Sequence, residues 1–123
     1  MAHPNKTKGD RAERAVVDYL SAFWPTIRTR AGFTDDLGDV IATTDAGLLV
    51  VQVKDCSSAR WSEWFDQLDE QGATCTARAH EPVLGGILVW KRRGSGDPAD
   101  WRVLSRLDNF AHMLDTLTEP EEP

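Results

Sequence analysis

Residues 38 to 54 read GDVIATTDAGLLVVQVK, two apolar runs with a short polar turn between them. Runs of β-branched residues on either side of turn residues are typical of a β-hairpin. In the second run, residues 48 to 54, successive side chains point to opposite faces of the strand. Gln52 and Lys54 therefore share one face, and Val51 lies on the other.

The length of the turn predicts which residues of the hairpin lie opposite each other. A two-residue loop at positions 45 and 46 pairs Thr44 with Gly47, and counting back sets Asp39 opposite Gln52. Directly opposed β-carbons lie roughly 4.5–5.5 Å apart, close enough for two side chains to share one metal ion. A slip of one residue would remove this alignment. Polar groups at the end of an apolar hairpin are costly to bury unless they are paired or bound to a cation.

Length and composition predict a single soluble domain, residues 1–123. The chain has 123 residues, of which 41% are hydrophobic and 28% charged, ordinary values for a globular protein. We expect flexible tails at residues 1–6 and 118–123. No apolar run approaches the roughly 20 residues that cross a bilayer, and the N-terminus lacks a signal-peptide pattern, so no membrane partner is expected.

Cysteine spacing and charge distribution bear on the cellular setting and on partners. Cys56 and Cys75 fit no disulfide or zinc spacing, which predicts a reducing cytoplasm, or the host cytoplasm if the protein is phage-encoded. The formal net charge of −6, taken alone, argues against nucleic-acid binding. Residues 1–30 nevertheless carry a balance of +3 and the remainder −9. Because local fields depend on distribution, a DNA-binding surface near the N-terminus remains open.

The rest of the chain alternates helical and strand-like periodicity. We expect a helix over 7–23, a short strand over 27–30, a helix over 60–77, a buried strand over 83–90, an edge strand over 101–104 and a closing helix over 105–117. With the hairpin, the order is α-β-β-β-α-β-β-α, an α/β fold with a mixed sheet flanked by helices.

Each predicted helix carries an apolar stripe. We assign the stripe of residues 60–77 to the core, because aromatic residues at helical spacing are more often core than a base-stacking platform. The stripes are Ala12, Val16, Tyr19, Leu20 and Phe23; Trp61, Trp64, Phe65, Leu68 and Cys75; and Leu107, Phe110, Leu114 and Leu117.

Glu13 precedes Val16, Val17 and Leu20 by three, four and seven residues, so it projects from the buried side of the first helix. The alternative is an acidic residue near the start of a helix, favoured there by the helix dipole.

A helix with Glu, then Gly-Asp on one strand and Gln-x-Lys on the next, resembles the PD-(D/E)xK nuclease superfamily. Within it, the chain is most similar to archaeal-type Holliday junction resolvases and related phage endonucleases. The likeness covers about residues 8 to 102 and implies a restriction-endonuclease-like core. The matching stretches are KGDRAER at 8–14, RAGFT at 30–34, GDVIA at 38–42 and VQVK at 51–54.

The resemblance assigns roles by position. It implies that Glu13, Asp39 and Gln52 bind a metal ion, with the Val53 carbonyl as a further ligand. Lys54 corresponds to the catalytic lysine. A hydroxyl residue, Thr34, stands in the loop before the metal-binding aspartate.

Hydrolysis of a phosphodiester must stabilise charge on the phosphoryl group and supply a nucleophilic water. Oxygen ligands favour Mg²⁺, with Mn²⁺ able to substitute, and the metal acidifies its water. Lys54, on the same face as Gln52, would orient the attacking water or neutralise the transition state. The alternative is that Asp39 and Lys54 form a structural ion pair of little energetic value.

Position 52 departs from the family, which usually has Glu or Asp there. An amide oxygen still binds a metal, but the site loses one negative charge and should bind cations more weakly. Loss of activity is therefore one open outcome. Asp35, Asp36 or Asp55 would compensate for the missing charge, and the alternative for each is a solvated loop charge.

We expect DNA contacts that are salt-dependent and read no sequence, although surface solubility explains each basic residue about equally well. The predicted function is cleavage of branched DNA by a homodimer, as in recombination and repair, since one small domain with one site must pair to cut two strands. The alternatives are a restriction- or repair-type nuclease or exonuclease on the same core, and an inactive nuclease-fold module that binds DNA or protein. The candidate phosphate-binding residues are Lys6, Lys8, Arg11, Arg14, Arg28, Arg30, Lys91, Arg92 and Arg93.

Overall fold

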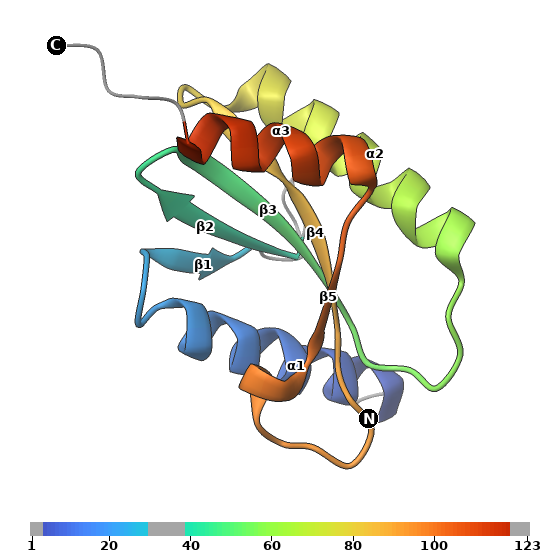
Figure 1. Cartoon of the computed structure of the whole chain (residues 1–123). Coiled ribbons are helices and arrows are strands. Elements are labelled where there is room, and N and C mark those ends of the chain that lie inside the picture. Colours follow the sequence, from blue (N-terminus) through green and yellow to red (C-terminus); the bar gives the residue numbers. More distant parts are fainter. Residues whose placement is uncertain (1–3, 30–38, 119–123) are drawn as a thin grey trace, which may run out of the picture.

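The computed structural model describes residues 4–29 and 39–118, with side chains from Gly9 onward. The order of helices and strands predicted from the sequence is confirmed (Figure 1). The elements are α1 (Pro4–Leu20), β1 (Thr26–Arg28), β2 (Val40–Thr44), β3 (Gly47–Lys54), α2 (Trp61–Arg78), β4 (Val83–Trp90), a 3₁₀ turn (Pro98–Asp100), β5 (Arg102–Leu104) and α3 (Leu107–Thr118). Over the described ranges, no helix combines the length and the apolar character needed to cross a membrane.

All five strands belong to one sheet in the order β1-β2-β3-β4-β5. Neighbouring strands are antiparallel except β3 and β4, which are parallel. A parallel pair needs a long crossover, and α2 supplies it between the end of β3 and the start of β4. The sheet is therefore mixed and flanked by helices, as the sequence predicts.

The hairpin between β2 and β3 has the predicted two-residue turn, with Thr44 paired to Gly47. The Thr44 hydroxyl donates to the Gly47 carbonyl at 2.7 Å and accepts from the Ala46 N–H at 3.2 Å, which closes the turn. Gly47 has φ +134°, and a β-carbon there would lie 2.6 Å from the Pro82 carbonyl oxygen. Glycine is required at this position for both reasons.

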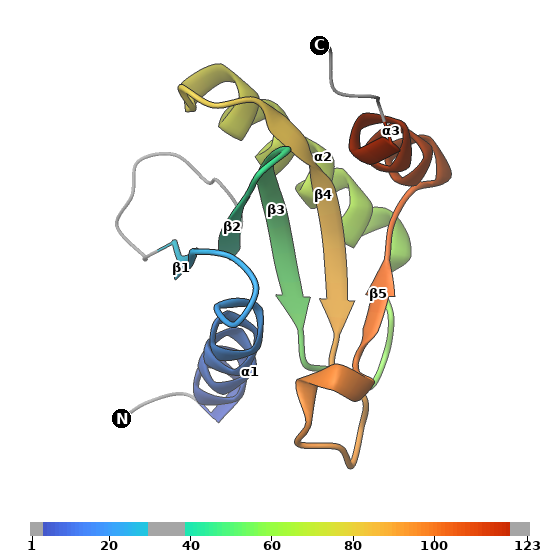
Figure 2. The same ribbon diagram turned by 60° about the vertical axis from the view of Figure 1, so that its left-hand side comes forward.

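The two faces of β3 are covered by different helices (Figure 2). Val51 and Val53 pack with Ala12 of α1 in one core cluster, and Val50 packs with α2 in the other. The alternation predicted for β3 is therefore confirmed. Because of this alternation, Gln52 lies on the α2 side of the sheet and its side chain contacts α2.

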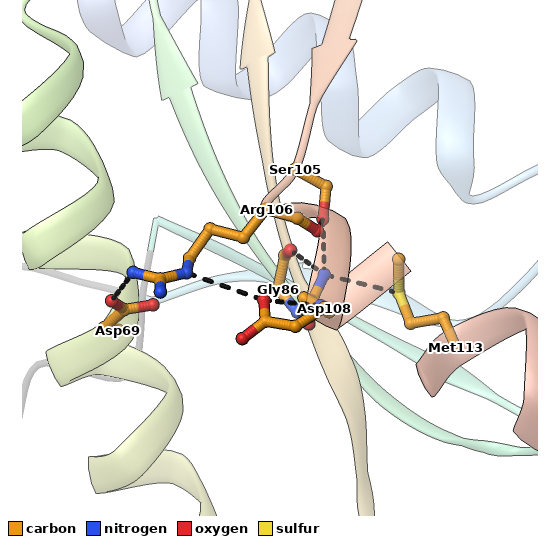
Figure 3. A network of polar contacts seen from close by, with 7 residues as sticks. Asp69, Gly86, Ser105, Arg106, Asp108 and Met113 are labelled. Atoms are coloured by element: carbon orange, nitrogen blue, oxygen red, sulfur yellow. Dashed lines mark hydrogen bonds and ion pairs between the residues drawn. The ribbon is translucent and has the colours of Figure 1, made fainter. Parts of the chain in front are cut away.

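Helix α3 attaches to β4 through the amide side chain of Asn109. Its Oδ1 accepts from the Gly86 N–H at 3.1 Å, and its Nδ2 donates to the Gly86 carbonyl at 2.7 Å. Just before α3, Arg106 pairs with Asp69 of α2 at 3.0 Å and with Asp108 at 3.5 Å (Figure 3). Asn109 thus takes the place of a neighbouring strand at Gly86, because β5 pairs with β4 only over Leu88–Trp90.

The boundaries of α1 differ from the prediction of 7–23. The helix begins at Pro4, inside the segment expected to be flexible, and ends at Leu20. Pro25 restricts the residue before it, and the chain turns over residues 21–23. Tyr19 and Phe23, of the first helix's apolar stripe, are exposed and pack on each other with ring centroids 5.6 Å apart.

The apolar stripe of α3 is exposed. Its members Leu107, Phe110, Leu114 and Leu117 are 47% to 80% exposed. The sheet is short at this edge, since β5 has three residues, so α3 contacts it mainly through Asn109 and Met113. In α2 the assignment to the core is right for Trp64, Leu68 and Cys75, which are buried, and wrong for Trp61, which is exposed at the start of the helix. The remaining boundaries of β1, α2, β5 and α3 shift by at most two residues where they are described, and β4 matches the prediction.

Candidate metal and phosphate site

The candidate site lies where β3 and β4 end. The parallel strands β3 and β4 end at Lys54 and Trp90, and β2 begins at the same edge because it is antiparallel to β3. Ligands of open α/β sheets bind outside the carboxyl ends of parallel strands. Asp39, directly before β2, and Lys54, the last residue of β3, are therefore brought to one edge of the sheet.

Asp39 is hydrogen-bonded to both neighbours of Gln52. Its N–H donates to the Val51 carbonyl at 3.1 Å, and its Oδ2 accepts from the Val53 N–H at 2.8 Å. The predicted direct pairing of Asp39 with Gln52 is not formed, since the ladder ends at Val40 opposite Val51. The carboxylate instead occupies the position of a main-chain acceptor at Val53, which fixes Asp39 beside Gln52.

Gln52 is almost fully buried, with 2% of its surface exposed. Its Nε2 donates to Oε1 of Gln67 on α2 at 3.1 Å. Its Oε1 has no hydrogen-bond partner within the described part of the chain. A buried carbonyl oxygen without a partner loses the hydration it has in the unfolded chain, which is costly, so a donor or a cation that reached this atom would stabilise it.

Lys54 meets the same glutamine. Its Nζ lies 3.4 Å from Gln67 Oε1 and 5.7 Å from the centroid of the Trp64 ring. Gln67 therefore positions both Gln52 and Lys54, a role that the sequence did not predict. The only signal is its place three residues after the buried Trp64, which puts a polar side chain near the buried side of α2.

Glu13 enters from α1, with 17% of its side chain exposed. Burial and, second, the negative charge of Asp39 raise the pKa of the Glu13 carboxyl above its ordinary value. Asp39 therefore lies within electrostatic range of the Glu13 carboxylate. Arg28 acts in the opposite direction, since its Nη2 lies 3.3 Å from Glu13 Oε2.

Arg28, which the sequence predicts to contact a DNA phosphate, forms ion pairs with acidic residues. The same Nη2 that meets Glu13 lies 3.0 Å from Asp10 Oδ1. β1 and α1 are adjacent, and this bridge links them. The guanidinium thus supplies positive charge where the sequence predicted only a metal ion.

The other predicted phosphate contacts are spread over two elements. Arg11 and Arg14 are exposed on α1, and Arg92 and Arg93 are exposed after β4. Lys91 pairs with Asp55 at 3.6 Å and lies 5.6 Å from the Trp101 ring centroid. The side chains of Lys6 and Lys8, and all of Arg30 and Thr34, lie outside what the structure describes.

The donor set suits a hard divalent cation. Across residues 4–29 and 39–118 no three His, Cys, Asp or Glu side chains form a metal-binding group. Glu13 and Asp39 lie within electrostatic range of each other, and Gln52 lies beside Asp39 with its side chain toward α2 and its amide oxygen without a partner among the described residues. Carboxylate and amide oxygens match the ligands of Mg²⁺ or Mn²⁺. Two carboxylates in place of three predict weak binding.

No protein-family model matches the chain, and no curated protein sequence matches it either.

Proposed function

We propose that this protein is a metal-dependent endonuclease that hydrolyses phosphodiester bonds in branched DNA, with a restriction-endonuclease-like core. One observation carries the proposal. Asp39 is hydrogen-bonded to Val51 and Val53, the two neighbours of Gln52, and Lys54 lies two residues after Gln52 on β3; the buried Gln52 Oε1 has no partner among the described residues. The order α1, three strands, α2, β4 supports the proposed core. DNA of this kind is the substrate that the resemblance implies.

Glu13, Asp39 and Gln52 would hold Mg²⁺ or Mn²⁺, with the Val53 carbonyl as a further ligand. When bound, the metal supplies Lewis-acid stabilisation of charge on the phosphoryl group and lowers the pKa of water. Burial and the negative charge of Asp39 raise the pKa of Glu13, and a bound cation would offset both effects. Because position 52 contributes no charge, we expect activity to need a higher metal concentration than a site with three carboxylates.

Lys54 supplies a fixed positive charge beside the scissile phosphate. Gln67 Oε1 holds its ammonium at 3.4 Å and, at the same time, the Gln52 amide at 3.1 Å. A charge held before the substrate arrives stabilises the transition state without reorganisation. Exposed arginines on α1 and after β4 would bind flanking phosphates.

Two copies are needed to cut two strands, and α3 offers a surface for a second copy. Its exposed Phe110, Leu114 and Leu117 border a groove of about 760 Å³, whose apolar floor includes Leu49 and Ile87. In a two-fold dimer the same patch from each copy meets, so an apolar helix beside an apolar groove is suited to self-association. We propose a homodimer through this face.

The competing function is a nuclease-fold module without catalysis. The pairing of Arg28 with Glu13 favours it, because a guanidinium already neutralises a proposed ligand. Gln52→Glu separates the two functions. Cleavage gained only in this variant would identify a degenerate site in the natural chain.

The test is cleavage of a labelled four-way junction and a matched linear duplex, with Mg²⁺, Mn²⁺ or EDTA. We expect metal-dependent nicking near the crossover. Cutting of linear duplex as well would indicate a restriction- or repair-type nuclease. No cleavage with either metal would refute the enzymatic function.

The decisive variant is Asp39→Asn, which removes the charge but keeps an oxygen that can accept from the Val53 N–H. Asp39→Asn and Lys54→Met, as separate variants, should each abolish cleavage without unfolding the chain. Asp45→Asn, in the exposed turn at the far end of the hairpin, is the matched control and should cleave normally. Cleavage retained in Asp39→Asn would refute the site.

A further inference from the structure

Three tryptophans form a cluster beside Lys54. Trp61 and Trp64 come from the first turn of α2, and Trp90 ends β4. Their ring centroids lie 5.3 to 5.8 Å apart, and each pair meets edge to face with interplanar angles of 72° to 89°. Such contacts are favourable for aromatic rings, so the cluster is a rigid unit.

The three tryptophans of the cluster differ in their exposure to solvent. Trp64 is 4% exposed, whereas Trp61 is 42% exposed. Trp90 is partly buried, and its indole N–H donates to the Cys56 carbonyl at 2.8 Å. The exposed part of Trp61 gains no hydrophobic stabilisation from the fold and is available to a ligand. Trp61 is thus held in place by its neighbours while much of it faces solvent.

Positive groups surround this aromatic surface. Lys54 Nζ lies 5.7 Å from the Trp64 centroid, and the Arg102 guanidinium carbon lies 6.0 Å from that of Trp90. Arg60 precedes Trp61, and its pair with Glu63 at 3.6 Å is solvent-exposed and therefore weak. These cations disfavour a cationic ligand. They suit a ligand with an aromatic ring and a phosphate.

We propose that Trp61 stacks on an unpaired base of DNA, with Lys54, Arg60 and Arg102 near the adjacent phosphates. This inference rests on the proposed function and specifies its substrate: branched DNA with unpaired nucleotides next to the scissile phosphate. Aromatic side chains with nearby cations bind single strands without sequence preference, because every base has a π-face. In an intact duplex those faces are covered by neighbouring bases, so duplex DNA gains nothing from Trp61.

The experiment measures binding separately from cleavage. A fluorescein-labelled oligothymidylate and a matched duplex are titrated with the full-length protein in EDTA, by anisotropy and by tryptophan fluorescence. We expect the single strand to bind more tightly than the duplex and to quench tryptophan emission. Trp61→Ala should weaken single-strand binding about 5- to 100-fold and leave duplex binding unchanged. Trp61→Phe should retain most of the affinity.

Phe23→Ala is the matched control, because Phe23 is an exposed aromatic residue outside the cluster and its loss should change nothing. Equal single-strand affinity of Trp61→Ala and the natural chain, or no single-strand binding at all, would overturn the inference. Loss of binding in Trp61→Ala without any metal-dependent cleavage by the natural chain would support this site and refute the nuclease. Cleavage together with unchanged binding in Trp61→Ala would support the nuclease and refute this site.

Discussion

Gln67 connects the two polar residues of β3 to α2. A single oxygen accepts from the buried Gln52 amide and from the Lys54 ammonium. The Gln52 amide is enclosed by the sheet and α2, so water cannot replace Gln67 as its acceptor. The position of Lys54 and part of the local stability therefore depend on one side chain.

We expect Gln67→Ala to lower the free energy of unfolding by about 1–3 kcal/mol, because it leaves the buried Gln52 amide without an acceptor. Urea denaturation measures this loss. Cleavage should fall as well, since Lys54 is no longer held. Asp66→Ala, at the exposed neighbouring position, should stay within about 0.5 kcal/mol of the natural chain. Equal losses in the two variants would contradict a special role for Gln67.

The raised pKa of Glu13 makes the free energy of unfolding depend on pH. Its pKa is raised in the folded chain by burial and by Asp39. The folded state therefore holds the proton more tightly than the unfolded chain does. The resulting contribution to stability is fully present below the ordinary pKa of a glutamate, about 4.3, and is lost as the pH rises through the raised value.

In EDTA, the unfolding free energy of the natural chain minus that of Glu13→Gln should decrease between about pH 4 and pH 7. Thermal or urea unfolding at several pH values measures this difference. Adding Mg²⁺ at pH 7 should raise the stability of the natural chain more than that of the variant, because a bound cation favours the ionised carboxylate. A difference that grows with pH in EDTA would contradict the raised pKa.

At the scale of secondary-structure elements, α3 is attached to β4 by few contacts. Asn109 satisfies both main-chain groups of Gly86 at the unpaired edge of β4. Gly85 leaves room for the helix, because a β-carbon there would lie 2.6 Å from Asn109 Oδ1 and 2.7 Å from Met113 Cγ. α3 and this edge of β4 are thus fitted to each other.

We expect Asn109→Ala to destabilise the chain by about 1–3 kcal/mol and to expose the Gly86 amide, since both of its main-chain groups lose their partner. Hydrogen exchange at Gly86 and urea unfolding measure the two effects. His112→Ala, exposed on the same helix, is the control. Unchanged exchange at Gly86 in Asn109→Ala would mean that α3 does not protect this edge.

At the scale of the whole molecule, α3 presents an apolar face to solvent. Leu107, Phe110, Leu114 and Leu117 are exposed in the single chain. An apolar patch of this kind marks an interaction surface on soluble proteins. A second copy would cover it and supply the second active site that cleavage of two strands requires.

We expect the natural chain to be a dimer and Leu114→Lys to be a monomer, because a charge in an apolar interface loses its hydration. Size-exclusion chromatography with light scattering measures the mass. Ala111→Lys adds the same charge at another exposed position of α3 and should leave the dimer intact. A monomeric natural chain at tens of micromolar would refute the proposed interface.

The sequence alone determined the sheet, the order of its elements and the hairpin that carries the candidate site. Alternation along a strand and the length of a tight turn are local properties, so they fixed which face Gln52 and Lys54 occupy and that Thr44 pairs with Gly47. They also brought Asp39 next to Gln52. The predicted pairing of Asp39 with Gln52 was wrong. The strand pairing stops one residue earlier, and the Asp39 carboxylate, in place of a main-chain carbonyl, accepts from the Val53 N–H.

Only the tertiary structure decided which residues meet from different elements. The contact of Gln67 with Lys54 and the bridge of Arg28 to Glu13 depend on how each helix is rotated against the sheet. Exposure along α3 likewise depends on how far the sheet extends beneath it. An apolar stripe specifies a face that avoids water, but not whether that face is covered by the same chain, by a second copy or by a ligand.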